Sequence, residues 1–421
     1  MAGPEADIAA RNGGRAVAPL DVDVAGSLSR IDQKKLRAYR LERLRSELRK
    51  RDYMGALLTD PLNIRYATGS RNMQVWTMHS PGRWAFVLTE GPVVLYEFPS
   101  SMHVNEGIET IAEMRPTIPW FFFLAGPRCE EKATLWADEV VSLIDRHGGR
   151  NRRLAVDRCE PMGAFKLAAR GIELFDAQEP IEMARVIKSP EEIAALRLSM
   201  AVCDAAISRM RAAIRPGITE NQLWAVLHDV NIAHDGEWIE SRLLTSGERT
   251  NPWFQECGNR VIEAGDVVAF DTDMVGPLGY LADISRSWIC PGKPPSNEQR
   301  RLYGLAQEQV LHNMSLLKPG LGFREFAEIC WPVPEEFLAN RYMMMVHGVG
   351  LVDEYPSIAY ARDFKDWGYD GVFQENMVVS VESFIGEVGG KEGIKLEQQV
   401  LITASGAIPL SQTPFEDAII V

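Results

Sequence analysis

One histidine and a group of acids fall on strand-like stretches in the second half of this 421-residue chain. The hydrophobic run at 343–346 predicts a buried strand that delivers His347 to a glycine-rich turn, with Asp353 six positions further on. Four more strand-like stretches contain or end in acids, at residues 267–273, 281–284, 378–382 and 395–397. Since a buried carboxylate without a partner is costly, acids gathered around one imidazole indicate a divalent metal site.

The triplet Asp271-Thr272-Asp273 supports a two-metal interpretation. If the strand continues through it, alternation places Asp271 and Asp273 on one side and Thr272 on the other. Two carboxylates about 7 Å apart along a strand suit a bridge between two cations. Oxygen-rich ligands with one imidazole favour Mn²⁺, Fe²⁺, Co²⁺ or Zn²⁺, and such a pair forms a Lewis-acid clamp for an anionic group. Any single acid is more simply an ordinary strand-end residue; the whole set favours metal.

Composition narrows the function classes. The formal net charge of −13 argues against nucleic acid and anionic membrane surfaces as partners. The six cysteines are scattered without a Cys-x-x-Cys pair, which fits a reducing, cytoplasmic location. No apolar stretch approaches the length of a membrane span, about 20 residues, and the N-terminus lacks the basic start and apolar core of a secretory signal.

The chain order predicts a tail and two domains. Residues 1–30 are interpreted as a flexible tail or an oligomer arm. Residues 31–187 alternate helix and strand, as in a small α/β domain, with a turn expected at 60–63. The sequence Ser189-Pro190-Glu191-Glu192 is typical of a capped helix start and opens a larger domain at 188–421.

The larger domain carries an internal duplication. A helix with a continuous apolar stripe is followed by a second helix capped by Thr219-x-x-Gln222, and the pattern recurs with Ser296-x-x-Gln299 and residues 323–329. Strands follow each helix pair, and each set of strands carries two acids: Asp271 and Asp283 in the first, Glu382 and Glu397 in the second. We therefore expect each repeat to contribute acids to a shared centre.

This arrangement resembles the pita-bread superfamily of creatinase, aminopeptidase P, prolidase and methionine aminopeptidase, over roughly residues 35–421. The resemblance implies an α+β fold, in which a duplicated pita-bread domain follows a smaller creatinase-type N-terminal domain. It also implies metal ligands in the order Asp, Asp, His, Glu, Glu. These would fall on Asp271 or Asp273, then Asp283, His347, Glu382 and Glu397.

Two departures from the peptidases argue against ordinary peptide hydrolysis. A carboxylate, in Asp353-Glu354-Tyr355-Pro356, replaces the second histidine of the usual His-Glu-x-Pro segment. An earlier peptidase histidine is also absent from residues 250–258. An imidazole that would help to stabilise a tetrahedral peptide intermediate is therefore missing.

The sequence more closely resembles the pita-bread dimethylsulfoniopropionate lyases of marine bacteria, the DddP family, at residues 60–68, 236–240, 250–258, 270–273 and 347–354. That resemblance implies Asp353 as the base, with Tyr342 and Trp76 at the substrate; for Trp76 a core or interface role is an equal alternative. It also implies two divalent metal ions, iron first, with Mn, Zn or Co as alternatives. Their six ligands would be Asp271, Asp273, Asp283, His347, Glu382 and Glu397.

The expected function is metal-dependent β-elimination that converts dimethylsulfoniopropionate, a small zwitterion, to dimethyl sulfide and acrylate. One alternative is a creatinase- or Xaa-Pro dipeptidase-like metallohydrolase acting on a C–N bond. Another is a pita-bread binding module without catalysis, which the intact ligand residues at all six positions, five acids and one histidine, disfavour. Two-domain relatives lead us to expect a homodimer.

Overall fold

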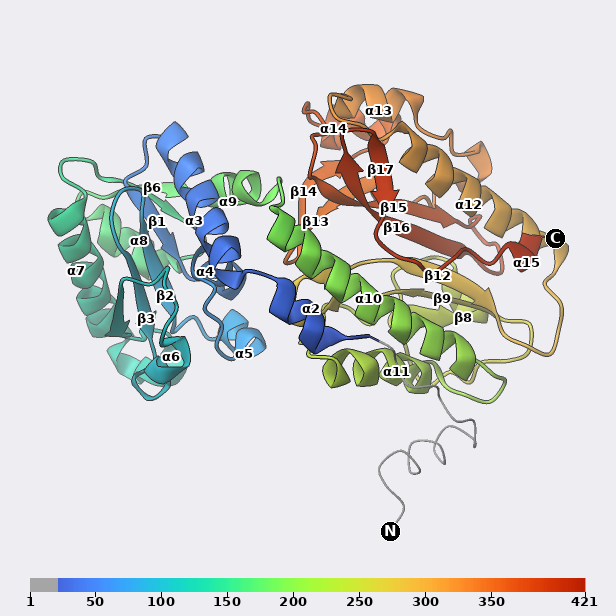
Figure 1. The fold of residues 1–421 in the computed structure, drawn as a ribbon, viewed down its shortest axis with the longest axis horizontal. Helices are drawn as coiled ribbons and strands as arrows, with labels where there is room; N and C mark the ends of the chain where they lie inside the picture. The colour runs from blue at the N-terminus through green and yellow to red at the C-terminus, as the bar shows by residue number, and fades with distance from the viewer. Residues whose placement is uncertain (1–21, 421) are drawn as a thin grey trace, which may run out of the picture. The chain divides into compact units, whose positions relative to one another are not determined.

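The computed structural model describes residues 22–420, which form two compact units. The first unit is Asp32–Glu191, and the second contains helix α2 (Val24–Arg30) and the chain from Glu192 onward (Figure 1). Most of the predicted tail lies outside the described residues. Its last part, however, is helical rather than loose: Asp23 caps α2 by accepting a hydrogen bond from the backbone of Gly26.

The first unit is a mixed six-stranded sheet with strand order β4-β3-β2-β1-β5-β6. Its core packs Leu57 and Phe86 of the sheet against Trp136 and Ile144 of a long helix, all nearly inaccessible to solvent. The strands are β1 (Gly55–Leu58), β2 (Trp84–Leu88), β3 (Val93–Glu97), β4 (Glu113–Pro116), β5 (Arg153–Val156) and β6 (Glu173–Asp176). The helices are α3 (Gln33–Lys50), α4 (Pro61–Thr68), α5 (Gln74–His79), α6 (Phe122–Ala125), α7 (Cys129–His147), α8 (Pro161–Ala168) and α9 (Gln178–Arg185).

The turn predicted at residues 60–63 is wrong, because a helix begins there. Asp60 is the N-cap of α4 and accepts a hydrogen bond from the backbone of Leu62, with Pro61 in the first turn. Gly69, in the left-handed conformation at φ +81°, ends the helix. Asp followed by Pro is as typical of a helix start as of a turn, so local composition alone does not separate the two.

The second unit contains the two expected helix pairs: α10 (Pro190–Ala213) with α11 (Glu220–Ala233), and α12 (Asn297–Leu316) with α13 (Phe323–Ile329). The capping boxes predicted at Thr219 and Ser296 are both present. The apolar stripe of α10 is buried, including Leu196, Met200 and Cys203. Two short helices, α14 (Phe364–Trp367) and α15 (Asp417–Ile420), lie nearer the C-terminus.

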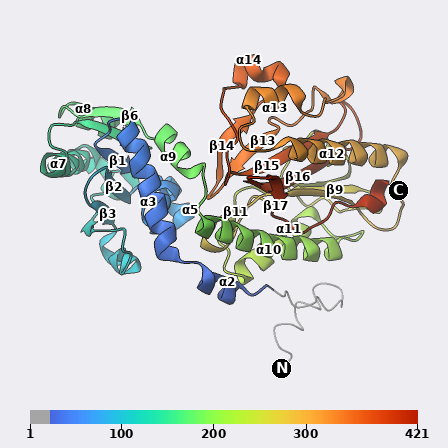
Figure 2. The same ribbon diagram turned by 45° about the horizontal axis from the view of Figure 1, so that its top comes forward.

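Three sheets complete the second unit, with strand orders β12-β9-β8, β14-β13-β15-β16-β17 and β11-β10-β7. Helix α12 lies along β15 and β16, while α11 lies against β7 and β8, and β8 belongs to the sheet that contains β9 (Figure 2). The strands are β7 (Trp238–Ile239), β8 (Leu244–Ser246), β9 (Val267–Asp271), β10 (Met274–Val275), β11 (Leu281–Ala282), β12 (Ser285–Ile289), β13 (Val346–Val349), β14 (Asp353–Ile358), β15 (Val378–Ile385), β16 (Ile394–Thr403) and β17 (Gly406–Pro409).

The duplication is visible in this order of elements, since a helix pair precedes an acid-bearing strand twice, before β9 and before β15. The two copies are unequal, because the first main sheet has three strands and the second has five. The predicted strand at 343–346 begins only at Val346, and Met343 is exposed. Among residues 22–420, no helix combines the length and apolar character that crossing a membrane requires.

Candidate metal centre

The six predicted ligands converge in the second unit. Ligand atoms of Asp271, Asp273 and Asp283 lie within 4.8 Å of one another, and the same holds for His347, Glu382 and Glu397. Strand register explains the approach: Glu382 on β15 stands directly opposite Glu397 on β16. The two groups adjoin where His347 Nε2 lies 3.5 Å from Asp283 Oδ2. Long-range pairing of strands thus gathers acids that are distant in sequence.

Asp271 and Asp273 share a site for a different reason from the predicted alternation. Strand β9 ends at Asp271, and Asp273 adopts a left-handed backbone with φ +37°. Thr272 points away, donating its hydroxyl to Ala282 O at 2.9 Å and accepting from Ile284 N at 3.0 Å. The chain therefore turns sharply at Asp273, and the Ser241 hydroxyl donates a hydrogen bond to the Asp273 carboxylate.

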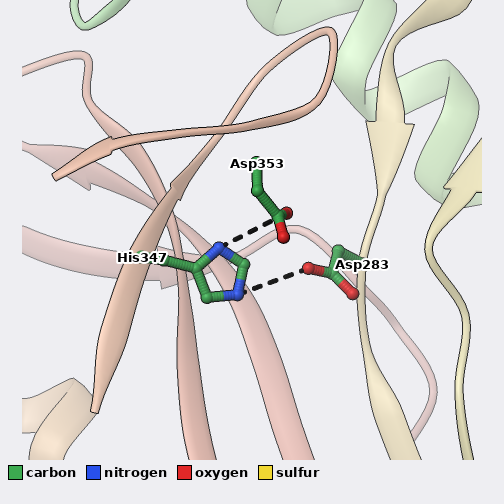
Figure 3. Close-up of side chains that lie close together, drawn as sticks. All are labelled: Asp283, His347 and Asp353. Atoms are coloured by element: carbon green, nitrogen blue, oxygen red, sulfur yellow. Dashed lines mark ion pairs between the residues drawn. The ribbon is translucent and has the colours of Figure 1, made fainter. Parts of the chain in front are cut away.

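His347 lies between carboxylates on both ring nitrogens (Figure 3). On the inner side, Nε2 is 3.4 Å from Glu382 Oε1 and 3.7 Å from Glu397 Oε1. On the outer side, Nδ1 is 3.2 Å from Gly348 O and 3.5 Å from Asp353 Oδ1. Burial alone would lower the pKa of His347, but these carboxylates raise it well above its ordinary value.

Two glycines allow the hairpin that presents His347. The β13–β14 register shifts between His347 and Gly348, and a Cβ at Gly348 would overlap the Tyr355 carbonyl. At Gly350 a Cβ would overlap the Glu354 carboxylate, which accepts a hydrogen bond from the turn amide of Leu351 at 3.0 Å. The glycine-rich sequence after the histidine is therefore a packing requirement of this turn.

Lys395 is a member of the site that the sequence reasoning missed. Its fully buried ammonium group donates to Glu382 Oε2 at 2.6 Å and to Ser285 Oγ at 2.7 Å. It also lies 3.2 Å from Asp271 Oδ2 and 3.4 Å from Glu397 Oε2. Burial lowers the pKa of Lys395, but the three carboxylates outweigh burial and raise it well above its ordinary value. One protein cation thus already offsets part of the acidic charge.

The remaining charge fits a metal. Three oxygens, Asp271 Oδ1, Asp283 Oδ1 and Glu397 Oε1, are buried without a hydrogen-bond partner in the described structure. Burial, reinforced by neighbouring acids, raises the pKa of Asp271 and Asp283 well above the ordinary value, and burial raises that of Asp273 to about 7. Orphaned buried acceptors are costly, and carboxylate oxygens together with an imidazole nitrogen are ligands that bind divalent cations. The donor set therefore fits divalent metal.

Asp353 lies beside the cluster and is open to water. Its side chain is 58% exposed, in contrast to the buried ligands. Desolvation raises its pKa, His347 opposes that rise, and the charge of Glu397 adds to it. Asp353 is therefore a carboxylate that can take a proton at the cluster and return it to solvent.

The two predicted substrate residues, Tyr342 and Trp76, lie in different units of the chain. Tyr342 is buried beside the cluster, with its ring centroid 4.5 Å from Lys395 Nζ. Burial, then the charges of Glu382 and Asp271, raises its pKa well above the ordinary value. Trp76 lies on α5 in the first unit, 37% exposed and in edge contact with Phe98, and its substrate role stays a prediction.

Known proteins resemble most of the chain, including both of its units. A family model described as metallopeptidase family M24 matches residues 194–404, and one described as the creatinase/prolidase N-terminal domain matches residues 40–187. The dimethylsulfoniopropionate lyase DddP of Roseovarius nubinhibens is 41% identical, over 92% of this chain and 88% of that protein. The protein of the same name from Roseobacter denitrificans is 39% identical, over 91% and 87%. The solved Xaa-Pro dipeptidase from Bacillus anthracis has a TM-score of 0.72 at 22% identity, covers 90% of this chain and 98% of its own, and shows the fold.

Proposed function

The chain belongs to the family of the DddP dimethylsulfoniopropionate lyases, within metallopeptidase family M24, and we propose that it cleaves dimethylsulfoniopropionate to dimethyl sulfide and acrylate. The family and the fold class expected from the sequence, a pita-bread domain after a creatinase-type N-terminal domain, are confirmed. The relatives at this level of identity are carbon–sulfur lyases by name.

The observation that carries the proposal is Asp353 at the rim of the ligand cluster, 3.5 Å from His347 Nδ1 and open to solvent. β-Elimination needs a base near the substrate α-carbon, and a positioned carboxylate supplies about 10²–10⁴-fold in rate. Peptide hydrolysis instead needs an activated water and a stabilised tetrahedral intermediate. The hairpin carries a carboxylate where the peptidases place a histidine, which favours elimination.

In the proposed reaction, Asp353 takes the proton from the substrate α-carbon. The electrons of that C–H bond form the carbon–carbon double bond as the bond between the β-carbon and sulfur breaks. Dimethyl sulfide leaves with the bonding pair, and acrylate remains. Exposure of Asp353 lets its proton pass to water before the next turnover.

Six side chains would hold two divalent ions: Asp271, Asp273, Asp283, His347, Glu382 and Glu397. When bound, such ions supply positive charge where the substrate carboxylate gains electron density as the α-proton leaves. Oxygen-rich ligation suits iron, our first assignment from the family resemblance, and equally accommodates Mn, Zn or Co. Lys395 would hold the carboxylates of Asp271, Glu382 and Glu397 in place through its ion pairs with them.

The test is release of dimethyl sulfide into the headspace above protein loaded with metal and shown by elemental analysis to contain it. We expect dimethyl sulfide and acrylate in equal amounts, and none after chelation. A panel of Xaa-Pro dipeptides run in parallel tests the hydrolase alternative. Loaded protein that releases no dimethyl sulfide would overturn the proposal, and peptide cleavage in its place would establish the alternative.

A further inference from the structure

Three aromatic side chains border the ligand cluster within the second unit, and the family resemblance assigned only Tyr342. Phe254 stacks on Tyr342 with ring centroids 5.2 Å apart and planes inclined by 29°. Trp253 lies behind them, packed on Phe384 with ring centroids 6.2 Å apart. We name Trp253, Phe254 and Tyr342 the aromatic wall.

Two rings of the aromatic wall already face a cation. Lys395 Nζ lies 4.5 Å from the Tyr342 ring centroid and 5.8 Å from that of Trp253. Both distances are within the range of cation–π attraction. The rings therefore border the cluster at a place where positive charge is stabilised, rather than packing only against the hydrophobic core.

The loop that carries Phe254 is tied down at both ends. The Asn251 side-chain amide donates to Glu387 O at 2.7 Å and to Gly390 O at 3.0 Å. At the other end, Cys257 N donates to Arg242 O at 2.8 Å. A fixed loop presents its side chain without an ordering cost when a ligand binds.

Phe254 itself has an unfavourable backbone conformation and a side chain exposed to solvent. Its backbone lies in the left-handed region at φ +66°, which bulky residues rarely adopt. Phe254 is 54% exposed, whereas Trp253 is only 7% exposed. Phe254 thus keeps a large apolar ring at the surface beside the ligand cluster, at a cost in backbone energy. Such a ring is a candidate for contact with a bound ligand.

We propose that the aromatic wall binds the dimethylsulfonium group and that Phe254 determines specificity for methylated onium cations. The proposal rests on the function proposed above for the identity of the substrate. A sulfonium has no N–H or O–H group to donate, so ring faces and nearby negative charge are what stabilise it. Each ring contact is expected to strengthen binding about 2- to 30-fold.

This role also predicts how the wall divides its effect between binding and turnover. Positive charge leaves the sulfur as its bond to carbon breaks, and neutral dimethyl sulfide has no cation–π attraction. The wall therefore stabilises bound substrate at least as well as the transition state. Loss of Phe254 should raise KM and leave kcat unchanged or slightly higher.

The test compares two unreactive carboxylates of the same shape on metal-loaded protein, by titration calorimetry. One is 3-(trimethylammonio)propionate, which carries the onium charge, and the other is 4,4-dimethylpentanoate, in which an uncharged tert-butyl group replaces the trimethylammonium group. We expect wild type to bind the onium ligand about 3- to 30-fold more tightly. Phe254→Leu should reduce that ratio about twofold or more, and Phe254→Tyr, which keeps a ring, should preserve it.

The control is Phe165→Leu, which changes another exposed phenylalanine, on α8 of the first unit (73% exposed against 54% for Phe254), and should leave the ratio unchanged. Because both ligands share the carboxylate, a partial loss of metal or of fold cancels in the ratio. Equal affinities in wild type, or a ratio that Phe254→Leu does not change, would overturn the proposal. An onium preference in a protein that releases no dimethyl sulfide would leave the wall established and refute only the proposed substrate.

Discussion

Asp353→Asn should abolish most of the turnover while leaving the metal in place. Asparagine keeps the volume and an oxygen that faces His347 Nδ1, but it cannot accept the substrate proton. The contact is 3.5 Å, longer than a normal hydrogen bond, so its contribution to orienting His347 is small. Losing a positioned base should lower kcat about 10²- to 10⁴-fold, or about 3–5 kcal/mol in the barrier.

The structure also predicts what the substitution leaves intact. The Asp353 side chain is 58% exposed, so the free energy of unfolding should change by no more than about 0.5 kcal/mol. Metal content should stay within about twofold of wild type. If Asp353 acted mainly by orienting the histidine, metal affinity would instead fall about 10- to 100-fold. Measuring kcat and metal content on one sample therefore distinguishes a role of Asp353 as the base from a role in orienting His347.

The assay measures initial rates of dimethyl sulfide release and the metal content of the same preparation. Asp370→Asn serves as the matched control, because Asp370 is a largely exposed acid whose ion-pair partner among residues 22–420 is Arg324. A variant Asp353→Asn with full metal content and kcat within about threefold of wild type would refute the assignment of Asp353 as the base.

Three further outcomes follow from the ligand cluster. Lys395→Met should destabilise the metal-free protein by about 3–5 kcal/mol, because it leaves buried carboxylates unpaired. The control Lys391→Met, at an exposed position, should not destabilise it. Equal melting temperatures of the two variants in calorimetry would contradict this prediction. Asp273→Asn removes a carboxylate from the group Asp271, Asp273 and Asp283 and leaves the group His347, Glu382 and Glu397 unchanged. The variant should bind one divalent ion per chain in elemental analysis. Two ions per chain would contradict the assignment of the ligands. Metal affinity should fall as pH drops below about 7, because protons then compete with metal for the carboxylates. Burial raises the pKa of Asp273 to about 7 and raises those of Asp271 and Asp283 well above the ordinary value. Equal metal affinities in titrations at about pH 6 and pH 8 would rule this out.

Local signals were enough to place much of the fold. The capping boxes at Thr219 and Ser296 and the apolar stripe of α10 depend on neighbouring residues, and they mark helices where the structure has them. Acids on strand-like stretches located five members of the cluster, because burial makes such acids unusual, and His347 after a hydrophobic run is the sixth. The chemistry of a costly buried charge is visible in a sequence even when the contacts are not.

What the sequence did not reveal depends on contacts between distant segments. Lys395 is the exception, because it lies two positions before Glu397 and strand alternation places the two on the same face. No local pattern brings Phe254 against Tyr342, since their approach depends on separate loops. The left-handed turn at Asp273 likewise has no clear sequence signal, because aspartate adopts many backbone conformations.

The most direct test of the central claim is anomalous X-ray diffraction from crystals of the metal-loaded protein, recorded above and below the absorption edge of the metal. We predict two adjacent peaks per chain enclosed by the carboxylates of Asp271, Asp283, Glu382 and Glu397 and by His347. A loaded protein with no peak among these side chains, or with its peaks elsewhere in the molecule, would contradict the account.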